Sequence, residues 1–279
     1  MRVLTAEELV SAEKALKGYF PKSLKVYGHI FSINRCKSHT TEVLVDSWPD
    51  FKTIICRSSL KGYRVDAFTK DEDNLRTILK DTDVLNWSGF FLLGGVDFCH
   101  LNMVKEVAAY RNASIYLAAK CFMMTLENAD HLPKLPVDRV SGSRITSLNM
   151  SHVDLVNKAW KFGGDESGAR IIQTLILNFP SCCIVDESGK PVSWILTYEY
   201  CAMGILYTSP EHRGKGYAKT LVTAAAKSLQ QQGYPIYCFI EEDNEQSYRL
   251  FKDLGFKEVP DYRAAWFRLN DDIPNKLIS

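Results

Sequence analysis

Residues 209–222, SPEHRGKGYAKTLV, combine the residue types that are best suited to binding an anion. Directly before an alanine-rich segment that predicts a helix stand Arg213, Gly214, Lys215 and Gly216. The first turn of a helix has backbone N–H groups without intrahelical partners, and the helix dipole adds partial positive charge there. A glycine lets a phosphate approach the backbone where a Cβ would obstruct it. The segment therefore predicts a phosphate site to which the two cations add charge.

The spacing of these residues narrows the kind of phosphate site. The GxxxxGK[ST] pattern of P-loops and the GxGxxG pattern of dinucleotide-binding folds are both absent from the sequence. Instead, Arg213, Gly216 and Ala218 fit an R-x-x-G-x-A pattern, in which the alanine is small enough for tight packing. A solvated basic turn is the alternative interpretation of the same residues.

The elements that must position this loop follow from hydrophobic periodicity and turn residues. From residue 144 onward the sequence predicts the order β-α-α-β-β-β-α-β-α-β-β, and the loop lies between the fourth strand and the helix after it. We expect Ser151 to cap the first of these helices. The last two strands are expected at 256–259 and 262–269.

The first half predicts a mixed α and β unit. A capping box of Thr5 and Glu8 predicts a helix at the start of the chain. Expected next are a three-strand meander at 23–35, 41–49 and 51–58, then helices at 71–81 and 100–111. The proline-, glycine- and serine-containing stretch 131–144 predicts a linker or long loop. We therefore expect two domains, 1–140 and 141–279.

Composition excludes several classes of protein. The chain of 279 residues is 46% hydrophobic, enough for a sizeable core, and its formal net charge of +1 argues against a nucleic-acid-binding protein. No apolar run approaches the ~20 residues of a membrane span. The eight cysteines form no C-x-x-C pair, so we expect reduced thiols in an intracellular protein and no metal site.

The phosphate-site segment carries a family resemblance. PEHRGKGYA resembles the pyrophosphate-binding signature of the GNAT N-acyltransferase superfamily, and Asn244, Gly255 and Phe256 stand where that fold has N…GF. A narrower resemblance covers nearly the whole chain. The segments that are similar to the glycine N-acyltransferase family and its glycine N-acyltransferase-like relatives are SLKVYGHIFSINR, DSWPDFKT, LVNKAWKFGG, FPSCCIVDESGKPVSW and TSPEHRGKGY.

This resemblance implies a fold and a reaction. The fold is α/β with a mixed sheet, a tandem GNAT-like arrangement with a degenerate N-terminal unit and a C-terminal acyl-CoA-binding domain. The reaction transfers an acyl group from acyl-coenzyme A, a co-substrate, to the amino group of glycine or another amino acid, without a prosthetic group. The expected coenzyme A contacts are Leu206, Tyr207, Thr208, Arg213, Gly214, Lys215, Gly216, Tyr217, Ala218, Lys219 and Asn244. Asn244 is equally suited to capping the helix that follows it.

The resemblance leaves two catalytic roles unfilled. Glycine N-acyltransferase uses a glutamate as base at the position of Ala202, and many GNAT enzymes place a tyrosine acid at the position of Phe251. Neither alanine nor phenylalanine transfers a proton. Glu199, three residues before Ala202, is the substitute base that we expect, with an exposed turn carboxylate as the alternative.

Other candidates have simpler structural explanations. Glu241 and Glu242 fit exposed strand ends, and Tyr248 fits a helical core stripe. His212 fits a place beside phosphate or solvent rather than a base. Cys201 and Cys238 fit buried structural thiols rather than an acyl-cysteine.

Two functions from different classes follow. The first is an acyl-coenzyme A:amino-acid N-acyltransferase, and the second is a catalytically weak or silent acyl-coenzyme A-binding or regulatory protein. The resemblance implies a mitochondrial location, with the cytosol as alternative because an acidic N-terminal helix is unlike a transit peptide. We expect a monomer that binds neither nucleic acid nor membrane.

Overall fold

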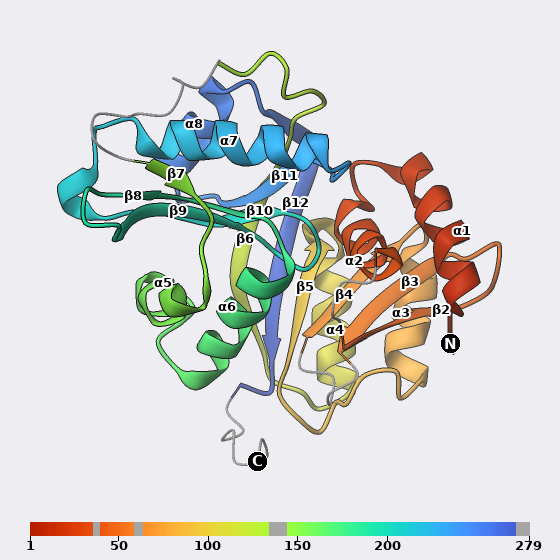
Figure 1. The fold of residues 1–279 in the computed structure, drawn as a ribbon. Coiled ribbons are helices and arrows are strands. Elements are labelled where there is room, and N and C mark those ends of the chain that lie inside the picture. Colours follow the sequence, from red (N-terminus) through yellow and green to blue (C-terminus); the bar gives the residue numbers. More distant parts are fainter. Residues whose placement is uncertain (36–39, 59–63, 134–143, 272–279) are drawn as a thin grey trace. The chain divides into compact units, whose positions relative to one another are not determined.

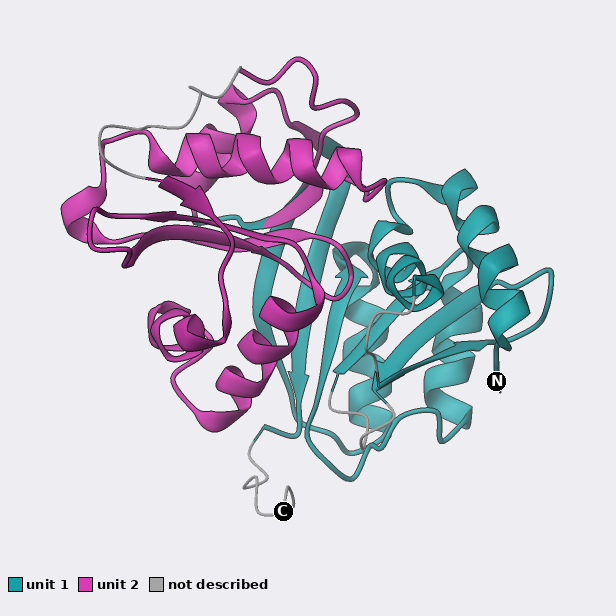
Figure 2. Ribbon diagram, viewed as in Figure 1, with its two compact units in different colours: residues 1–123, 240–243, 259–279 teal, residues 124–239, 244–258 magenta. Residues whose placement is uncertain are grey.

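The computed structural model describes residues 1–35, 40–58, 64–133 and 144–271 (Figure 1). The chain forms two compact units (Figure 2). Unit 1 comprises residues 1–123, 240–243 and 259–279, and unit 2 comprises residues 124–239 and 244–258. The domain boundary predicted between residues 140 and 141 lies outside the described residues and stays a prediction.

Unit 1 is a mixed sheet with helices. Its helices are α1 (Ala6–Leu16), α2 (Leu24–Asn34), α3 (Glu72–Asp81) and α4 (Leu101–Tyr110), with 3-10 turns at Lys17–Tyr19 and Phe98–His100. Its strands are β1 (Arg2–Val3), β2 (Thr41–Val45), β3 (Thr53–Ser58), β4 (Arg64–Thr69), β5 (Phe91–Asp97) and most of β6 (Ile115–Thr125) and β12 (Lys257–Leu269). The strand order is β1-β2-β3-β4-β5-β12-β6. The pair β4–β5 is parallel, whereas β1–β2, β2–β3, β3–β4 and β5–β12 are antiparallel.

Unit 2 contains the predicted phosphate loop. Its elements are β7 (Arg144–Thr146), α5 (Val153–Ala159), α6 (Glu166–Asn178), β8 (Ser181–Val185), β9 (Pro191–Thr197), β10 (Met203–Thr208), α7 (Tyr217–Gln231), β11 (Tyr237–Glu241) and α8 (Glu245–Asp253), with 3-10 turns at Met150–His152 and Pro210–His212. The strand order is β11-β10-β9-β8-β7. In Figure 1, α7 covers one face of β8–β10, and α5 and α6 lie against the other face.

Most predicted elements are present. The capping box is confirmed, because Thr5 accepts a hydrogen bond from the Glu8 N–H and the Glu8 carboxylate accepts one from the Thr5 N–H. The three predicted helices of the first half are confirmed as α1, α3 and α4. The predicted order of the second half is confirmed up to its last two strands.

Three sequence predictions are wrong. Residues 23–35 form helix α2 instead of a strand, and the meander consists of β2, β3 and β4. Residues 24–32 are all buried. A segment in which every residue is buried has no hydrophobic period that distinguishes a helix from a strand. Ser151 does not cap α5, whose N-cap residue His152 makes no side-chain capping bond. Asn149 instead caps the 3-10 turn before α5 and accepts from the Ser151 N–H. The two final strands are one strand, β12, in which Asp261 has a φ of 53°.

A buried ion cluster joins α2 to the sheet of unit 1. Lys25 Nζ and His29 Nε2 each lie 2.6 Å from a carboxylate oxygen of Asp66 on β4. All three side chains are at most 6% exposed. Because neighbouring strand residues face opposite sides, Asp66 meets α2 while Val65 packs with α3 and α4. The ion cluster therefore fixes α2 on one face of the sheet.

The charges in this cluster determine the ionisation of Asp66. Burial by itself would raise the pKa of Asp66, but the Lys25 charge and the hydrogen bonds from His29 and Lys25 outweigh it and lower the pKa below its usual range. A lowered carboxyl pKa stabilises the fold above the unfolded value of about 4, and this stability is lost as the pH falls toward the folded pKa.

We predict that Asp66→Asn lowers the free energy of unfolding by about 3 to 5 kcal/mol, because it removes the carboxylate charge that lies 2.6 Å from the buried Lys25 ammonium. The variant should also lose less stability than the wild type when the pH falls below about 4. Urea unfolding across this pH range measures both effects. The control is Asp83→Asn, whose carboxylate is 99% exposed. A loss for Asp66→Asn as small as that of the control would contradict a stabilising role for the ion cluster.

Candidate functional site

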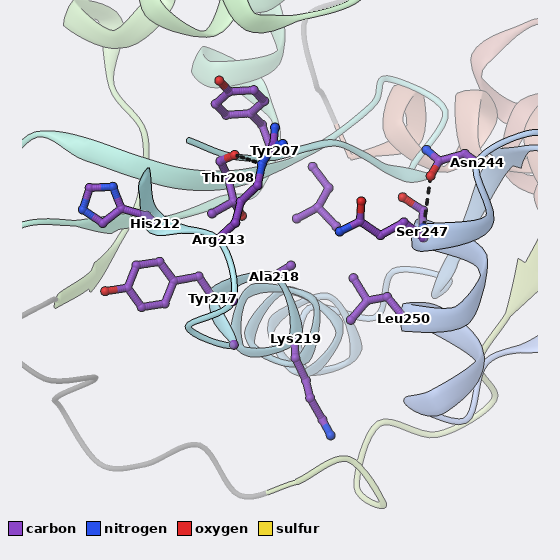
Figure 3. Close-up of a pocket in the computed structure, with 14 residues that line it drawn as sticks. Tyr207, Thr208, His212, Arg213, Tyr217, Ala218, Lys219, Asn244, Ser247 and Leu250 are labelled. Carbon is purple, nitrogen blue, oxygen red and sulfur yellow. Dashed lines mark hydrogen bonds between the residues drawn. The ribbon is translucent and has the colours of Figure 1, made fainter. Parts of the chain in front are cut away.

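A pocket of about 360 Å³ lies where β10, the phosphate loop, α7 and α8 meet. In Figure 3, Tyr207, Thr208 and Arg213 lie on one side and Asn244, Ser247 and Leu250 on the other. The pocket is lined by Leu206, Tyr207, Thr208, His212, Arg213, Gly214, Gly216, Tyr217, Ala218, Lys219, Asn244, Gln246, Ser247 and Leu250. Ten of the eleven residues predicted to contact coenzyme A line it, and the eleventh, Lys215, is exposed beside it.

The two glycines have the backbone that an anion loop requires. Gly214 and Gly216 have φ angles of 75° and 78°, in a region that residues with a side chain rarely adopt. A Cβ added at either position would meet no heavy atom of the described residues within 4 Å. The space beside each glycine is therefore open, and backbone conformation rather than crowding explains why glycine stands there.

Helix α7 begins at Tyr217 without a side-chain cap. Gly216 occupies the N-cap position and has no side chain that could accept from the first N–H groups. By contrast, Asp165 caps α6 and Asn244 caps α8 through side-chain oxygens. The N–H groups of the first turn of α7 are therefore available to a ligand in the pocket, with the helix dipole behind them.

Arg213 and His212 are held by local hydrogen bonds. Arg213 Nε donates to the Thr208 carbonyl oxygen at 3.2 Å, which leaves the terminal nitrogens of the guanidinium for other partners. His212 Nδ1 lies 3.0 Å from Ser209 Oγ, and its ring lies nearly parallel to that of Tyr217. Arg213, Lys215 and Lys219 are exposed, so the pocket is open to solvent on its cationic side.

Strand β10 separates from its parallel neighbour beside the pocket. Within the described residues, Met203 and Cys238 form the one matched pair between β10 and β11. The register against β9 also shifts between Gly204 and Tyr207, and Ile205 has a φ of 52°. This β-bulge places one extra residue in β10. Among the described residues of unit 2, the backbone of β10 beyond Met203 has no further matched pair on β11.

The far wall of the pocket comes from α8. The Asn244 side-chain oxygen accepts from the Ser247 N–H at 3.0 Å, so the cap that the sequence suggested is present. Because Oδ1 is used in this bond, the exposed Asn244 amide offers its N–H groups to the pocket. Gln246, Ser247 and Leu250 complete this wall and were missed by sequence analysis, although helical spacing after Asn244 is a signal that could have found them.

The two positions without a proton-transfer group are buried. Ala202 is 1% exposed at the entry to β10, and Phe251 is 4% exposed on α8. Glu199, the expected substitute base, lies half-buried in the turn between β9 and β10. It does not line the pocket that holds the phosphate loop.

The remaining candidates mostly have structural partners. Glu242 binds Lys120 and Arg263, and although burial would raise its pKa, these two hydrogen bonds outweigh burial and lower it. The Tyr248 hydroxyl donates to Glu258 at 2.7 Å. Cys201 and Cys238 are buried thiols outside any disulfide, as expected for structural cysteines.

Known proteins with similar sequences identify the family. The profile of the aralkyl acyl-CoA:amino acid N-acyltransferase family matches residues 1–180, and that of FR47-like protein matches residues 183–266. The chain belongs to the aralkyl acyl-CoA:amino acid N-acyltransferase family. It is 28% identical to glycine N-acyltransferase of Rattus norvegicus, over 94% of this chain and 95% of the rat protein. It is 27% identical to glycine N-phenylacetyltransferase of Bos taurus, over 91% and 94% of the two chains.

Solved structures agree on the fold. A Drosophila protein superposes with a TM-score of 0.84 at 22% identity, over 96% of this chain and 97% of that one. A tandem GNAT protein from the clavulanic acid biosynthesis pathway superposes with a TM-score of 0.54 at 12% identity, over 95% and 96% of the two chains. The predicted tandem GNAT-like α/β fold and the N-acyltransferase class are thereby confirmed.

Unit 1 also has a strand, a helix and a parallel strand in that order, as the pocket does. Its helix, however, begins with acidic residues instead of following cationic ones. There β4 leads to α3, and β5 pairs with β4 in parallel. However, Asp71 caps α3 with its carboxylate, and Glu72 and Asp73 occupy the first turn. The Asp71 carboxylate accepts a hydrogen bond from the start of α3, and the three acids add negative charge there, whereas α7 begins without a side-chain cap. Of the two arrangements, the one in unit 2 is therefore the better suited to an anion.

The described residues contain neither a metal-binding cluster nor a membrane-spanning helix. Within the described ranges, no group of three histidine, cysteine or acidic side chains is arranged to bind a metal ion. Among the helices of the same ranges, none has the length and apolar character needed to cross a bilayer.

Proposed function

We propose that unit 2 binds acyl-coenzyme A along β10 and at the start of α7, and that the chain transfers the acyl group to the amino group of glycine or another amino acid. The observation that carries this proposal is the uncapped N-terminus of α7, with two positive-φ glycines facing an open pocket. Family membership supplies the reaction class. The domains we propose are 1–140, a degenerate GNAT-like unit, and 141–279, the acyl-CoA-binding unit.

The donor groups suit a pyrophosphate. Backbone N–H groups from Gly214 to Lys219 would bind the phosphate oxygens, whereas the Arg213 N–H already donates to the Pro210 carbonyl oxygen. The side chains of Arg213, Lys215 and Lys219 would add charge. The pantetheine arm would lie against the backbone of Leu206, Tyr207 and Thr208, where β10 has left β11. Asn244 would donate its amide N–H groups from the opposite wall.

The proposed chemistry is direct attack of the acceptor amine on the thioester carbonyl carbon. A C–N bond forms, the C–S bond breaks, the coenzyme A thiolate leaves, and the amine loses its proton. Glu199 is the proposed proton acceptor, directly or through water. Holding amine and thioester together lowers the barrier even where the base is weak.

A second function is favoured by the two buried positions without a proton-transfer group. Ala202 and Phe251 stand where relatives of this fold use a glutamate and a tyrosine, so a weak or silent acyl-coenzyme A-binding homologue is the alternative. The acceptor identity, the mitochondrial location and the monomeric state are proposals that rest on the resemblance alone.

We predict that Gly216→Val weakens coenzyme A binding at least tenfold in calorimetry. The valine side chain would enter the open space at the start of α7, and its φ of 78° would be strained. The matched control is Gly189→Val in the β8–β9 turn, where φ is 83° and space is equally open. The control should lose similar thermal stability and retain coenzyme A affinity. Equal affinity of both variants would argue against this loop as the site.

Calorimetry of the same wild-type protein also counts the sites. We predict one coenzyme A per chain, because acidic residues begin α3 in unit 1 where α7 in unit 2 is uncapped. Two equivalent sites per chain would contradict the assignment of the anion site to unit 2 alone.

Release of free thiol from acyl-coenzyme A, with and without glycine, tests catalysis. We expect Glu199→Gln to lower the glycine-dependent rate at least tenfold if Glu199 takes the proton, and Ala202→Glu to raise it, most at mildly acidic to neutral pH. The controls are Glu187→Gln and Glu187→Asp, which change an exposed carboxylate in the β8–β9 turn, far from β10. No glycine- or other amino-acid-dependent thiol release from either wild type or Ala202→Glu would favour the silent-binding alternative.

A further inference from the structure

A buried serine beside the pocket determines which hydrogen-bonding group Thr208 can offer. Ser193 on β9 is fully buried, and its hydroxyl oxygen lies 2.7 Å from the Tyr207 carbonyl oxygen and 2.7 Å from Thr208 Oγ1. A hydroxyl has one proton and two acceptor lone pairs. A carbonyl oxygen only accepts, so the single Ser193 proton is donated to Tyr207.

The hydroxyl proton of Thr208 is then committed as well. Between two hydroxyl oxygens at 2.7 Å one must donate, and Ser193 has already given its proton to Tyr207. Thr208 therefore donates to Ser193. Thr208 is half-buried and lines the pocket, so the remaining lone pairs on its Oγ1 are what it presents to a ligand. It acts as an acceptor there and not as a donor.

The acceptor on Thr208 contrasts with the hydrogen-bond donors of the phosphate loop. The start of α7 and the Arg213 guanidinium offer donors, which suit phosphate oxygens. Phosphate oxygens at neutral pH have no proton to give to Thr208, so a phosphate placed there would gain no bond and would meet a second oxygen. The group that fits is an N–H donor next to a phosphate, and the pantetheine arm of coenzyme A has amide N–H groups.

We propose that Thr208 Oγ1 accepts an amide N–H of the pantetheine arm and that Ser193 is a positioning residue that keeps Thr208 in the acceptor state. This inference rests on the proposed binding of acyl-coenzyme A to unit 2. It gives the ligand a direction in the pocket, with phosphate at the N-terminus of α7 and amide beside the end of β10. The hydrogen bond from Arg213 Nε to the Thr208 carbonyl oxygen connects these two parts. Arg213 belongs to the phosphate end, and the Thr208 side chain belongs to the amide end.

Calorimetry with two ligands tests the proposal. Coenzyme A has the pantetheine arm, and 3′-phosphoadenosine 5′-diphosphate keeps both phosphates of the pyrophosphate but lacks the arm. We expect Thr208→Val to weaken coenzyme A binding about three- to tenfold, the loss of one neutral hydrogen bond, and to change binding of the nucleotide diphosphate less than twofold. Where direct heats are small, the nucleotide diphosphate is measured by competition against coenzyme A. Thr208→Ser retains the hydroxyl and should bind coenzyme A like the wild type.

The role of Ser193 is tested by a double-mutant cycle. Ser193→Ala should weaken coenzyme A binding in the wild-type background and change it less than twofold in the Thr208→Val background, because it acts through Thr208. A merely structural role would change both backgrounds equally. The control is Thr174→Val on α6, which removes a threonine hydroxyl bonded to the Arg170 carbonyl away from the pocket.

The outcomes separate this inference from the proposed function. If wild type fails to bind coenzyme A, the proposed function fails and the inference falls with it. If wild type binds coenzyme A and Thr208→Val binds it within twofold, the inference alone is wrong. An equal loss for coenzyme A and 3′-phosphoadenosine 5′-diphosphate would place a phosphate at Thr208 and would also overturn it.

Discussion

The candidate site depends on backbone N–H groups at the start of α7 that no side chain satisfies. Such groups are costly when buried and useful when a ligand supplies the acceptor. Gly214 and Gly216 make the arrangement possible, since their positive φ angles turn the loop into the helix without a capping side chain. The end of β10 lines the pocket together with these groups. The candidate anion site therefore depends on the conformation of one loop and on the strand that leads into it.

The two units carry opposite charge at the same place of a shared arrangement of elements. Both have a strand, a helix and a parallel strand in that order. In unit 1, the helix is closed by the Asp71 carboxylate and followed by further acids, and the adjoining strand β4 carries the buried Asp66 cluster. In unit 2, glycine and cations occupy the same part of the arrangement. The fold alone thus does not define a site, and the residues at one helix N-terminus do.

Sequence analysis could find the loop because its chemistry is local. RGKG before a helix needs no tertiary information, and ten of the eleven expected contacts line one pocket. Helix α2 was missed because a segment whose residues are all buried, Lys25 and His29 included, has no hydrophobic period that distinguishes a helix from a strand. The Ser193 hydroxyl was missed because its role depends on the β9–β10 register, which places it opposite Thr208. The sequence did not decide which residue is the base, because Glu199 lies in a turn and a sequence does not give the orientation of a side chain in a turn.

Backbone amide hydrogen exchange with and without coenzyme A tests the central claim most directly, because it reports on the N–H groups themselves. The account predicts that coenzyme A slows exchange at residues 214–219, at the start of α7, and leaves residues 71–74, at the start of α3, unchanged. Protection at α3 with none at α7, or saturating coenzyme A without any slowing at 214–219, would contradict it.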